Sequence, residues 1–356
     1  MAKVTSVVRE DATRVAATWK GALVELSGTT LLISGAGGFL CSFALDVIVA
    51  LNEVFDEPVT VIAMDNYKTG LPERIAHLND YPNMRVVNHD VSTAYVPECA
   101  VDWIIHGASI ASPSFYRRYP LETIDANVSG TRHMLELART AGVKGYLQLS
   151  SSEIYGDPEP AAIPTSEEYT GRVSCTGPRA CYDESKRLGE TLSMTYHRLY
   201  GVPVKIVRPF NVYGPGQRLD DARIIPDMMS AAIEDRPIVL FSDGRATRAF
   251  CYISDFVAGM LLVMARGASG EAYNVGNDEE TSIAQAAQTM VQIAGSSNVM
   301  IEYRISEDRE YLTGNPHRRC PNLRKVFAAT GWRPSIGITE GFERTLRSYR
   351  VELASV

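Results

Sequence analysis

The sequence lacks the patterns that mark several large classes of protein. No apolar run approaches the roughly 20 residues that a membrane-spanning helix needs, so we expect no membrane segment. Basic residues are not in excess, because 35 Lys and Arg against 42 Asp and Glu give a net charge of -7. This sign argues against nucleic acid or an anionic membrane as a partner. An anionic ligand would have to be held by local arginines or by backbone amides.

Cysteine and histidine are also sparse and irregularly spaced. The six cysteines form no CxxC pair, and the six histidines show no ligand spacing. We therefore expect free thiols in a reducing compartment and no dedicated metal site. Residues 1–27 mix polar and apolar side chains with acids and lack the apolar centre of a secretory peptide. We interpret them as an N-terminal extension, helical at about residues 13–23, of a cytoplasmic protein.

What the sequence does contain is a regular alternation of strand and helix patterns from residue 30 onward. Short apolar runs alternate with stretches of helical periodicity, the longest at about residues 121–141 and around Tyr182. Such alternation predicts βαβ units and a parallel sheet with helices on both faces. We predict an α/β fold, a Rossmann-like doubly wound parallel sheet with a smaller C-terminal α/β domain that binds substrate.

The stretch SGAGGFLCS has the pattern of a dinucleotide-binding loop. Gly35 and Gly38 fit the first two glycines of a GxxGxxG loop between a strand and a helix, and Cys41 stands at the third. Glycine permits the tight turn and lets backbone amides, such as those of Phe39 and Leu40, approach a pyrophosphate at the helix N-terminus. The third glycine serves helix–strand packing, so a small cysteine is a tolerable substitute.

Acids follow at the ends of the next two predicted strands. Asp65 lies 27 residues after Gly38, where its carboxylate would accept hydrogen bonds from the adenosine ribose and repel a 2′-phosphate. This favours NAD over NADP as the cofactor. Asn66 is assigned to the same end of the cofactor site, and Asp90 and Val91 are expected near the adenine. Asp90 has an alternative interpretation as a plain strand-end cap.

Composition changes after about residue 211, where proline and glycine interrupt shorter segments and arginines gather. The change predicts a smaller domain over the carboxyl edge of the sheet, where open α/β sheets bind ligands. We expect an NAD-binding domain at 28–210 with about 246–268. The smaller, substrate-binding domain is then expected at 211–245 and 269–356.

Tyr182 and Lys186 stand four residues apart and therefore share one face of a helix. Such pairs on helix surfaces are usually inert, so this one needs a partner to be informative. Tyrosine has a pKa of ~10, and a neighbouring ammonium and a positively charged nicotinamide would both favour the phenolate. A phenolate can take a proton from a sugar hydroxyl while hydride leaves the same carbon. Ser151, in the stretch QLSSSEIYG, would supply the third member of the set, a hydroxyl.

These motifs together resemble the extended short-chain dehydrogenase/reductase family that modifies nucleotide sugars. Within it the resemblance is to the UDP-glucuronate decarboxylase (UDP-xylose synthase) branch, over about residues 30–348. It rests on the stretches MDNYKTG, ASPSFYRRYP, NVSGTRHMLELAR, SSEIYGDP, GPRACYDESKR, FNVYGPGQR, TRAFCYISD and NPHRRCPN. GPRACYDESKR with TRAFCYISD is specific for this branch, whereas the glycine loop and the Tyr–Lys pair mark only the superfamily.

The resemblance implies a role for each matched position. Tyr182 would be the base for the 4-hydroxyl, Lys186 its partner and Ser151 a ligand of the oxygen at carbon 4. Ser152 and Glu153 would face the sugar near carbon 5. The implied catalytic set is Tyr182, Lys186, Ser151, Ser152, Glu153 and Arg248. The implied substrate-binding positions are Ser112, Asn211, Arg223, Arg248 and Arg319.

The same resemblance implies NAD as cofactor, a nucleotide sugar as substrate and a homodimer joined through a four-helix bundle. The two long helices would form it, one carrying an apolar stripe from Leu121 to Ala138 and the other from Tyr182 to Leu199. The leading function is decarboxylation of UDP-glucuronate to UDP-xylose through a 4-keto intermediate. A 4,6-dehydratase with Glu153 as carbon-5 base, or a 4-epimerase, is the alternative. A non-catalytic NAD-binding regulator is disfavoured by the intact Ser, Tyr and Lys set.

Several positions depart from the family pattern. Asp125 stands where the decarboxylases commonly have Lys, and Arg117 and Arg118 are additions. Asn315 and Asn322 stand where acids are usual. These changes bear on the sugar and the nucleotide rather than on the oxidation step, so the sugar and the base of the nucleotide stay open.

Overall fold

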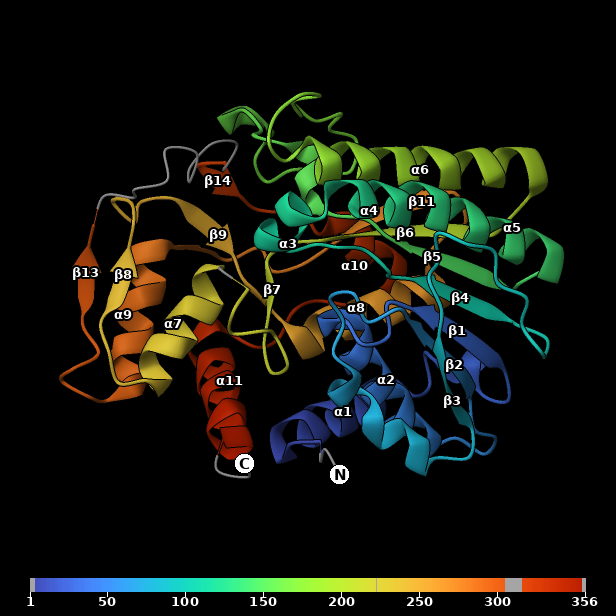
Figure 1. Cartoon of the computed structure of the whole chain (residues 1–356), viewed down its shortest axis with the longest axis horizontal. Coiled ribbons are helices and arrows are strands. Elements are labelled where there is room, and N and C mark those ends of the chain that lie inside the picture. Colours follow the sequence, from blue (N-terminus) through green and yellow to red (C-terminus); the bar gives the residue numbers. More distant parts are fainter. Residues whose placement is uncertain (1–3, 222, 305–315, 354–356) are drawn as a thin grey trace.

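The computed structural model describes residues 4–221, 223–304 and 316–353 (Figure 1). Its main feature is a wholly parallel seven-stranded sheet in the order β3-β2-β1-β4-β5-β6-β11. These strands are β1 (Thr30–Ser34), β2 (Thr60–Asp65), β3 (Met84–Asn88), β4 (Trp103–His106), β5 (Gly145–Leu149), β6 (Val204–Pro209) and β11 (Glu271–Val275). The predicted Rossmann-like doubly wound sheet is confirmed.

Helices cover both faces of this sheet (Figure 1). One face carries α5 (Thr131–Ala141) and α6 (Ala180–Tyr200), with α3 (Pro113–Arg118) and α4 (Pro120–Asp125) near their N-terminal ends. The other carries α2 (Phe39–Asn52) and α8 (Ile253–Arg266), with α1 (Ser6–Trp19) and α10 (Arg324–Thr330) packed on them. Because both faces are covered, β4 and β5 are buried along their whole length and are mostly apolar, with His106 and Gln148 as their polar side chains.

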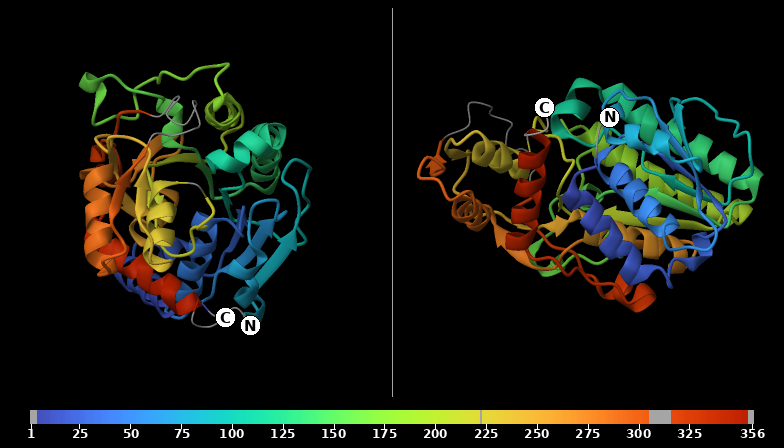
Figure 2. Two further views of the ribbon diagram at one scale, coloured as in Figure 1. Left: turned by 60° about the vertical axis from the view of Figure 1, so that its left-hand side comes forward. Right: turned by 90° about the horizontal axis from the view of Figure 1, so that it is seen from below.

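A smaller group of elements lies beside the carboxyl ends of the strands, as both views of Figure 2 show. Its strands are β7 (Val212–Tyr213), β8 (Ile238–Leu240), β9 (Thr247–Ala249), β10 (Cys251–Tyr252), β12 (Glu280–Ser282), β13 (Ile301–Tyr303) and β14 (Arg318–Arg319). Its helices are α7 (Ile224–Ile233), α9 (Ile283–Ala294) and α11 (Ile338–Leu353). β9 is the centre of a three-stranded sheet between β12 and β14.

β11 differs from the expected division of the chain. Its residues fall within the range 269–356 assigned to the smaller domain, yet β11 pairs in parallel with β6 and forms an edge of the main sheet. The chain returns to the sheet through α8, which contacts both β6 and β11. Such a strand–helix–strand crossover is the usual way to add a parallel strand.

The helix expected at 121–141 is interrupted by a π turn at Ala126–Gly130, between α4 and α5. A π turn holds more residues than an α turn and therefore rotates the faces of the helix that follows. Leu121 is 71% exposed and Ile124 38%, whereas Leu135 and Ala138 are buried. The single apolar stripe predicted for this helix is wrong: its first part faces solvent and its second part faces the core.

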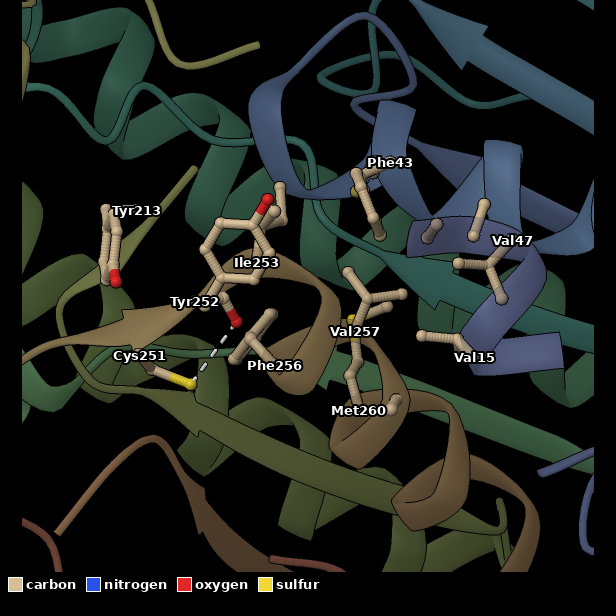
Figure 3. Packing of buried hydrophobic residues seen from close by; sticks show 14 of the residues in the cluster. Val15, Phe43, Val47, Tyr213, Cys251, Tyr252, Ile253, Phe256, Val257 and Met260 are labelled. Atoms are coloured by element: carbon tan, nitrogen blue, oxygen red, sulfur yellow. Dashed lines mark hydrogen bonds between the residues drawn. The ribbon is translucent and has the colours of Figure 1, made fainter. Parts of the chain in front are cut away.

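The N-terminal extension is part of the folded core. α1 begins at Ser6, earlier than the predicted residue 13, because Thr5 caps it by accepting a hydrogen bond from the Val8 amide. It packs against α2, α8 and α11. Figure 3 shows Val15 of α1 among apolar side chains that include Val47 of α2 and Met260 of α8. Within the described ranges, no helix is long and apolar enough to cross a bilayer.

A buried carboxylate anchors α1. The Asp11 side chain is 0% exposed and accepts hydrogen bonds from the Tyr252 hydroxyl at 2.6 Å and from Arg344 at 3.0 Å. Arg14 of the same helix donates to Asp11 at 3.0 Å as well, to the oxygen that also accepts from Arg344. This cluster joins three distant parts of the chain: α1, the end of β10 and α11.

Replacing Asp11 with Ala should lower the free energy of unfolding by about 3 kcal/mol or more, because it leaves buried charged and polar partners uncompensated. The matched control is Glu10→Ala, since the Glu10 side chain is 54% exposed beside Arg347. An exposed pair contributes about 1 kcal/mol or less. Urea unfolding monitored by circular dichroism measures both variants. Equal midpoints for the two would show that the buried cluster does not stabilise the protein.

Candidate active site

A large cleft lies between the carboxyl ends of the main sheet and the smaller group of elements. Its volume of about 1150 Å³ exceeds the upper end, ~1,000 Å³, of ordinary small-ligand pockets, so it has room for a dinucleotide and a second ligand. Fourteen of the predicted site residues line it: Gly35, Gly38, Phe39, Leu40, Ser112, Ser151, Ser152, Glu153, Tyr182, Lys186, Asn211, Arg223, Arg248 and Arg319. Residues far apart in the sequence thus meet in one place.

The glycine loop between β1 and α2 fits a pyrophosphate. Gly35 has a φ of +78°, and a Cβ there would lie 2.7 Å from the Ala108 backbone nitrogen. Gly38 is the N-cap of α2, and a Cβ there would lie 2.9 Å from the Gly35 carbonyl oxygen. Among the described residues no side chain caps α2, so the first amides of this helix can bind an anion. Cys41 packs closely, since a Cβ on Gly107 would lie 2.4 Å from its sulfur.

The predicted ribose and adenine positions lie next to this loop but outside the cleft lining. Asp65 ends β2, and its carboxylate accepts hydrogen bonds from the Gly37 amide at 2.9 Å and the Tyr67 amide at 2.7 Å. Burial raises the pKa of Asp65, which these backbone hydrogen bonds oppose. The Asn66 side chain donates to Asp90 at 2.8 Å, so these two strand ends are joined. Val91 is buried.

Tyr182 and Lys186 share one face of α6, and both are buried in the cleft wall. The Lys186 ammonium donates to the Leu149 carbonyl at 2.8 Å and lies 5.9 Å from the centroid of the Tyr182 ring. Burial lowers the pKa of Lys186 to about 8. Burial also raises the pKa of Tyr182, although a hydrogen bond with Ser151 opposes this. The lowered tyrosine pKa expected from the ammonium is therefore not a property of the protein alone.

Glu153, expected to face the sugar, is held by two arginines. It lies in the 3-10 turn η5 (Ser152–Tyr155) directly after β5. Arg319 contacts both of its oxygens, one of them at 2.9 Å, and Arg179 contacts the second oxygen as well. Burial alone would raise the pKa of Glu153, but the arginines Arg319, Arg179 and Arg248 bring it down to about 2.

Arg248 completes a cluster of three guanidinium groups around this carboxylate. It pairs in register with Arg319, across strands β9 and β14, and donates to the Thr247 carbonyl at 2.7 Å. Burial lowers the pKa of Arg248 to about 10, and the charges of Arg319 and Arg179 contribute. Positive charge therefore exceeds negative charge at this end of the cleft, beside Tyr182. We call Arg179, Arg248 and Arg319 with Glu153 the arginine cluster.

Three further residues of the site were not predicted. Arg179 and Asp183 lie within the stretch GPRACYDESKR, in which only Tyr182 and Lys186 were predicted to belong to the site. Tyr116 of α3 stacks on Tyr182, with ring centroids 5.3 Å apart and planes 12° apart. The charges of Arg179 and Asp183 were a usable signal in the sequence, whereas nothing local to Tyr116 indicates stacking on a residue 66 positions away.

The departures from the family pattern occupy different places. Arg117 lines the cleft, and Arg118 is exposed, with its guanidinium 5.3 Å from the Tyr119 ring centroid. Asp125 is exposed at the end of α4. Asn322 accepts a hydrogen bond from the Arg324 amide at 3.0 Å, at the start of α10. Asn315 lies outside the described residues.

The chain is similar to known proteins over most of its length. Residues 31–276 match the model of the NAD dependent epimerase/dehydratase family. UDP-glucuronic acid decarboxylase 1 of Xenopus tropicalis is 37% identical over 331 residues, which cover 93% of this chain and 74% of that protein. UDP-glucuronic acid decarboxylase 5 of Arabidopsis thaliana is 36% identical over 327 residues, covering 92% and 91%.

Solved structures share the fold. A dTDP-glucose 4,6-dehydratase from Streptomyces venezuelae, with NAD bound, superposes with a TM-score of 0.79 at 26% identity, covering 92% of this chain and 98% of that one. A UDP-glucuronic acid 4-epimerase from Bacillus cereus, in complex with UDP-glucuronic acid and NAD, superposes with a TM-score of 0.75 at 23% identity, covering 91% and 99%. Taken with the glycine loop and the Tyr–Lys pair in one cleft, these matches show that the chain belongs to the NAD dependent epimerase/dehydratase family.

Proposed function

We propose that this protein decarboxylates UDP-glucuronate to UDP-xylose. The observation that carries the proposal is the arginine cluster, which places an excess of positive charge beside Tyr182. The relatives named above, at 36% and 37% identity, are UDP-glucuronic acid decarboxylases, which supports the same substrate. A sugar carboxylate is the anion that this end of the cleft would bind.

NAD, when bound along the glycine loop, supplies the acceptor for a hydride from carbon 4 and later returns it. The chain's own residues handle the protons. Tyr182, hydrogen-bonded to Ser151, takes the proton of the 4-hydroxyl as the hydride leaves. Lys186 adds a positive charge near the phenol while its ammonium stays anchored on Leu149. Tyr182 returns the proton to the oxygen of carbon 4 in the last step.

The 4-ketone turns the carboxylate at carbon 6 into a β-keto acid. The bond between carbons 5 and 6 breaks, its electron pair passes to the ketone as an enolate, and carbon dioxide leaves. Carbon 5 then takes up one proton, supplied by solvent in the net reaction, and the ketone forms again. Arg248 and Arg319 would orient the carboxylate before this step. Ser112, Asn211 and Arg223 would hold the sugar and diphosphate; the Asn211 side-chain oxygen is buried with no hydrogen-bond partner among the described residues.

The 4,6-dehydratase alternative needs a base at carbon 5. Glu153 was the candidate, but its pKa of about 2 and its contacts with Arg319 and Arg179 make it a weak base. The same contacts suit a residue that positions two guanidinium groups. We therefore assign Glu153 to positioning and favour decarboxylation over dehydration.

We also propose that the protein is a cytoplasmic homodimer. Leu121 and Ile124 of α4 and Leu188 of α6 are 71%, 38% and 44% exposed, and α4 and α6 pack side by side. A second copy would cover these side chains by adding its own α4 and α6 in a four-helix bundle. All six cysteines are free, which fits a reducing compartment.

UDP-glucuronate should be converted to UDP-xylose and carbon dioxide without net reduction of the cofactor, as followed by mass spectrometry. Tyr182→Phe should lower the turnover number by about a hundredfold or more, since it removes the group that accepts the proton. NAD binding should change little, because the ring and its stacking on Tyr116 remain. A variant that keeps a tenth of the rate would contradict the role of Tyr182. Loss of water from a neutral nucleotide hexose, with UDP-glucuronate inert, would contradict the decarboxylase.

Glu153→Gln should separate oxidation from decarboxylation. Tyr182, Lys186 and Ser151 are intact in this variant, so reduced nicotinamide should still form on mixing with UDP-glucuronate. Carbon dioxide should appear more slowly by at least about tenfold, because Arg179 and Arg319 lose the carboxylate that positions them. Stopped-flow absorbance and a carbon dioxide assay measure the two steps. Equal slowing of both steps would show that Glu153 acts before or during oxidation.

The double variant Leu121→Asp, Leu188→Asp should shift the protein from dimer to monomer in sedimentation velocity. Two charges placed within the bundle would be buried without partners. The matched control is Val96→Asp, because Val96 is an apolar side chain that is 84% exposed elsewhere on the surface. A dimer that survives the double variant, or a monomeric unmodified protein, would rule out this interface.

A further inference from the structure

Asp183 is a buried carboxylate for which the reaction above has no use. It lies in the first turn of α6, directly after Tyr182, and is 7% exposed. One of its oxygens is 3.5 Å from the Arg179 guanidinium. The other is buried and has no hydrogen-bond partner in the part of the chain that the structure describes. A buried ionised carboxylate normally has hydrogen bonds at both oxygens, so this environment favours a form that carries a proton.

Charged and titratable groups face Asp183 from several elements. They are Glu153 of η5, Arg179 at the start of α6, Arg319 of β14, Tyr116 of α3, and Cys181 and Tyr182 of α6. Burial and the charge of Glu153 raise the pKa of Asp183 to about 7, while Arg179 and Arg319 oppose the rise. Asp183 is therefore poised between its two forms near neutral pH.

Arg179 is shared between two acids. It contacts Glu153 closely and Asp183 at the longer distance of 3.5 Å. A sugar carboxylate in the arginine cluster would be a third anion facing the same guanidinium groups. Its charge would repel an ionised Asp183 across a poorly hydrated site, so the protonated form would be favoured further.

Resting on the proposed function, we propose that Asp183 is a positioning residue that couples substrate binding to proton uptake. It would take one proton from solvent as the sugar carboxylate joins the arginine cluster, and return it to solvent once the carboxylate has left as carbon dioxide. No bond to the substrate is formed or broken by Asp183. The exchange keeps the cluster from holding three anions at once.

The coupling predicts how affinity depends on pH. Where Asp183 is already protonated, binding of a carboxylate costs nothing extra. Above the pKa of about 7 the site must first take up a proton, so the affinity for a carboxylate-bearing sugar falls by up to about tenfold per pH unit. A neutral sugar on the same nucleotide brings no third anion and should not show this dependence. Asp183 thus makes recognition of the acid form of the sugar sensitive to pH.

The test measures dissociation constants for UDP-glucuronate and UDP-glucose between pH 6.5 and 8.5. NAD-loaded full-length protein carrying Tyr182→Phe is used, so that neither ligand turns over. The quantity compared is the dissociation constant of UDP-glucuronate divided by that of UDP-glucose. Titration of the uridine affects both constants equally and cancels in this ratio. Titration of Lys186 cancels as well where it affects the binding of both sugars equally. With Asp183 present, the ratio should rise by about tenfold or more over this range. A ratio that does not change with pH would overturn the proposal, and this outcome needs no variant of Asp183.

Asp183→Asn imitates the protonated form and is the decisive variant. At pH 8.5 it should bind UDP-glucuronate more tightly than the protein that retains Asp183. Its ratio of the two dissociation constants should change by less than about twofold between pH 6.5 and 8.5. A misfolded variant would lose affinity, so tighter binding cannot arise from damage to the fold. Asp183→Glu should keep the rise with pH. An Asp183→Asn variant with the same slope as its parent would overturn the proposal.

Asp46→Asn is the matched control. Asp46 is also a carboxylate whose pKa is raised by burial, but it contacts His77 at 2.8 Å and lies outside the cleft lining. Asp46→Asn should leave the pH dependence of the ratio unchanged. If the ratio no longer rose with pH in this variant, the pH dependence could not be assigned to Asp183. If unmodified protein binds UDP-glucuronate with the expected slope but releases no carbon dioxide, the decarboxylase proposal fails while the role of Asp183 in binding stands.

Discussion

The ion pairs of Glu153 hold the two sides of the cleft together. Glu153 follows β5 of the main sheet, Arg319 belongs to β14 of the smaller group, and Arg179 begins α6. Taking these charges out of water is costly, and only close pairing offsets the cost. Three separate elements must therefore meet at this carboxylate for the cleft to form. The position of Tyr182, three residues after Arg179, follows from the same contact.

Charge balance then decides what the cleft can bind. The protein as a whole carries a net charge of -7, yet one end of its cleft holds three guanidinium groups around Glu153. The local positive charge would attract a ligand carboxylate there, although the protein as a whole is negatively charged. Asp183 is the second acid at this end, and its protonation near neutral pH would adjust the balance when a ligand anion arrives.

The N-terminal helix supports this site from the far side. Asp11 of α1 binds Tyr252, which lies four residues after Arg248 on the segment that runs from β9 through β10 into α8. Arg344 of α11 meets the same carboxylate. The segment that carries Arg248 is thus fixed at its other end by a helix that precedes the nucleotide-binding loop.

The sequence by itself determined the features that depend on neighbouring residues. Gly35 and Gly38 are required by a turn only a few residues long, Tyr182 and Lys186 share a face because of helical spacing, and alternating patterns led to the parallel sheet. Only the tertiary structure decided the rest. Arg319, one of the two arginine partners of Glu153, is 166 residues away from it in the sequence. β11 joins the sheet through a crossover, and the π turn divides an apolar stripe that looked continuous. The pKa of Tyr182 is raised because burial sums over side chains from distant parts of the chain, and no local pattern records that sum.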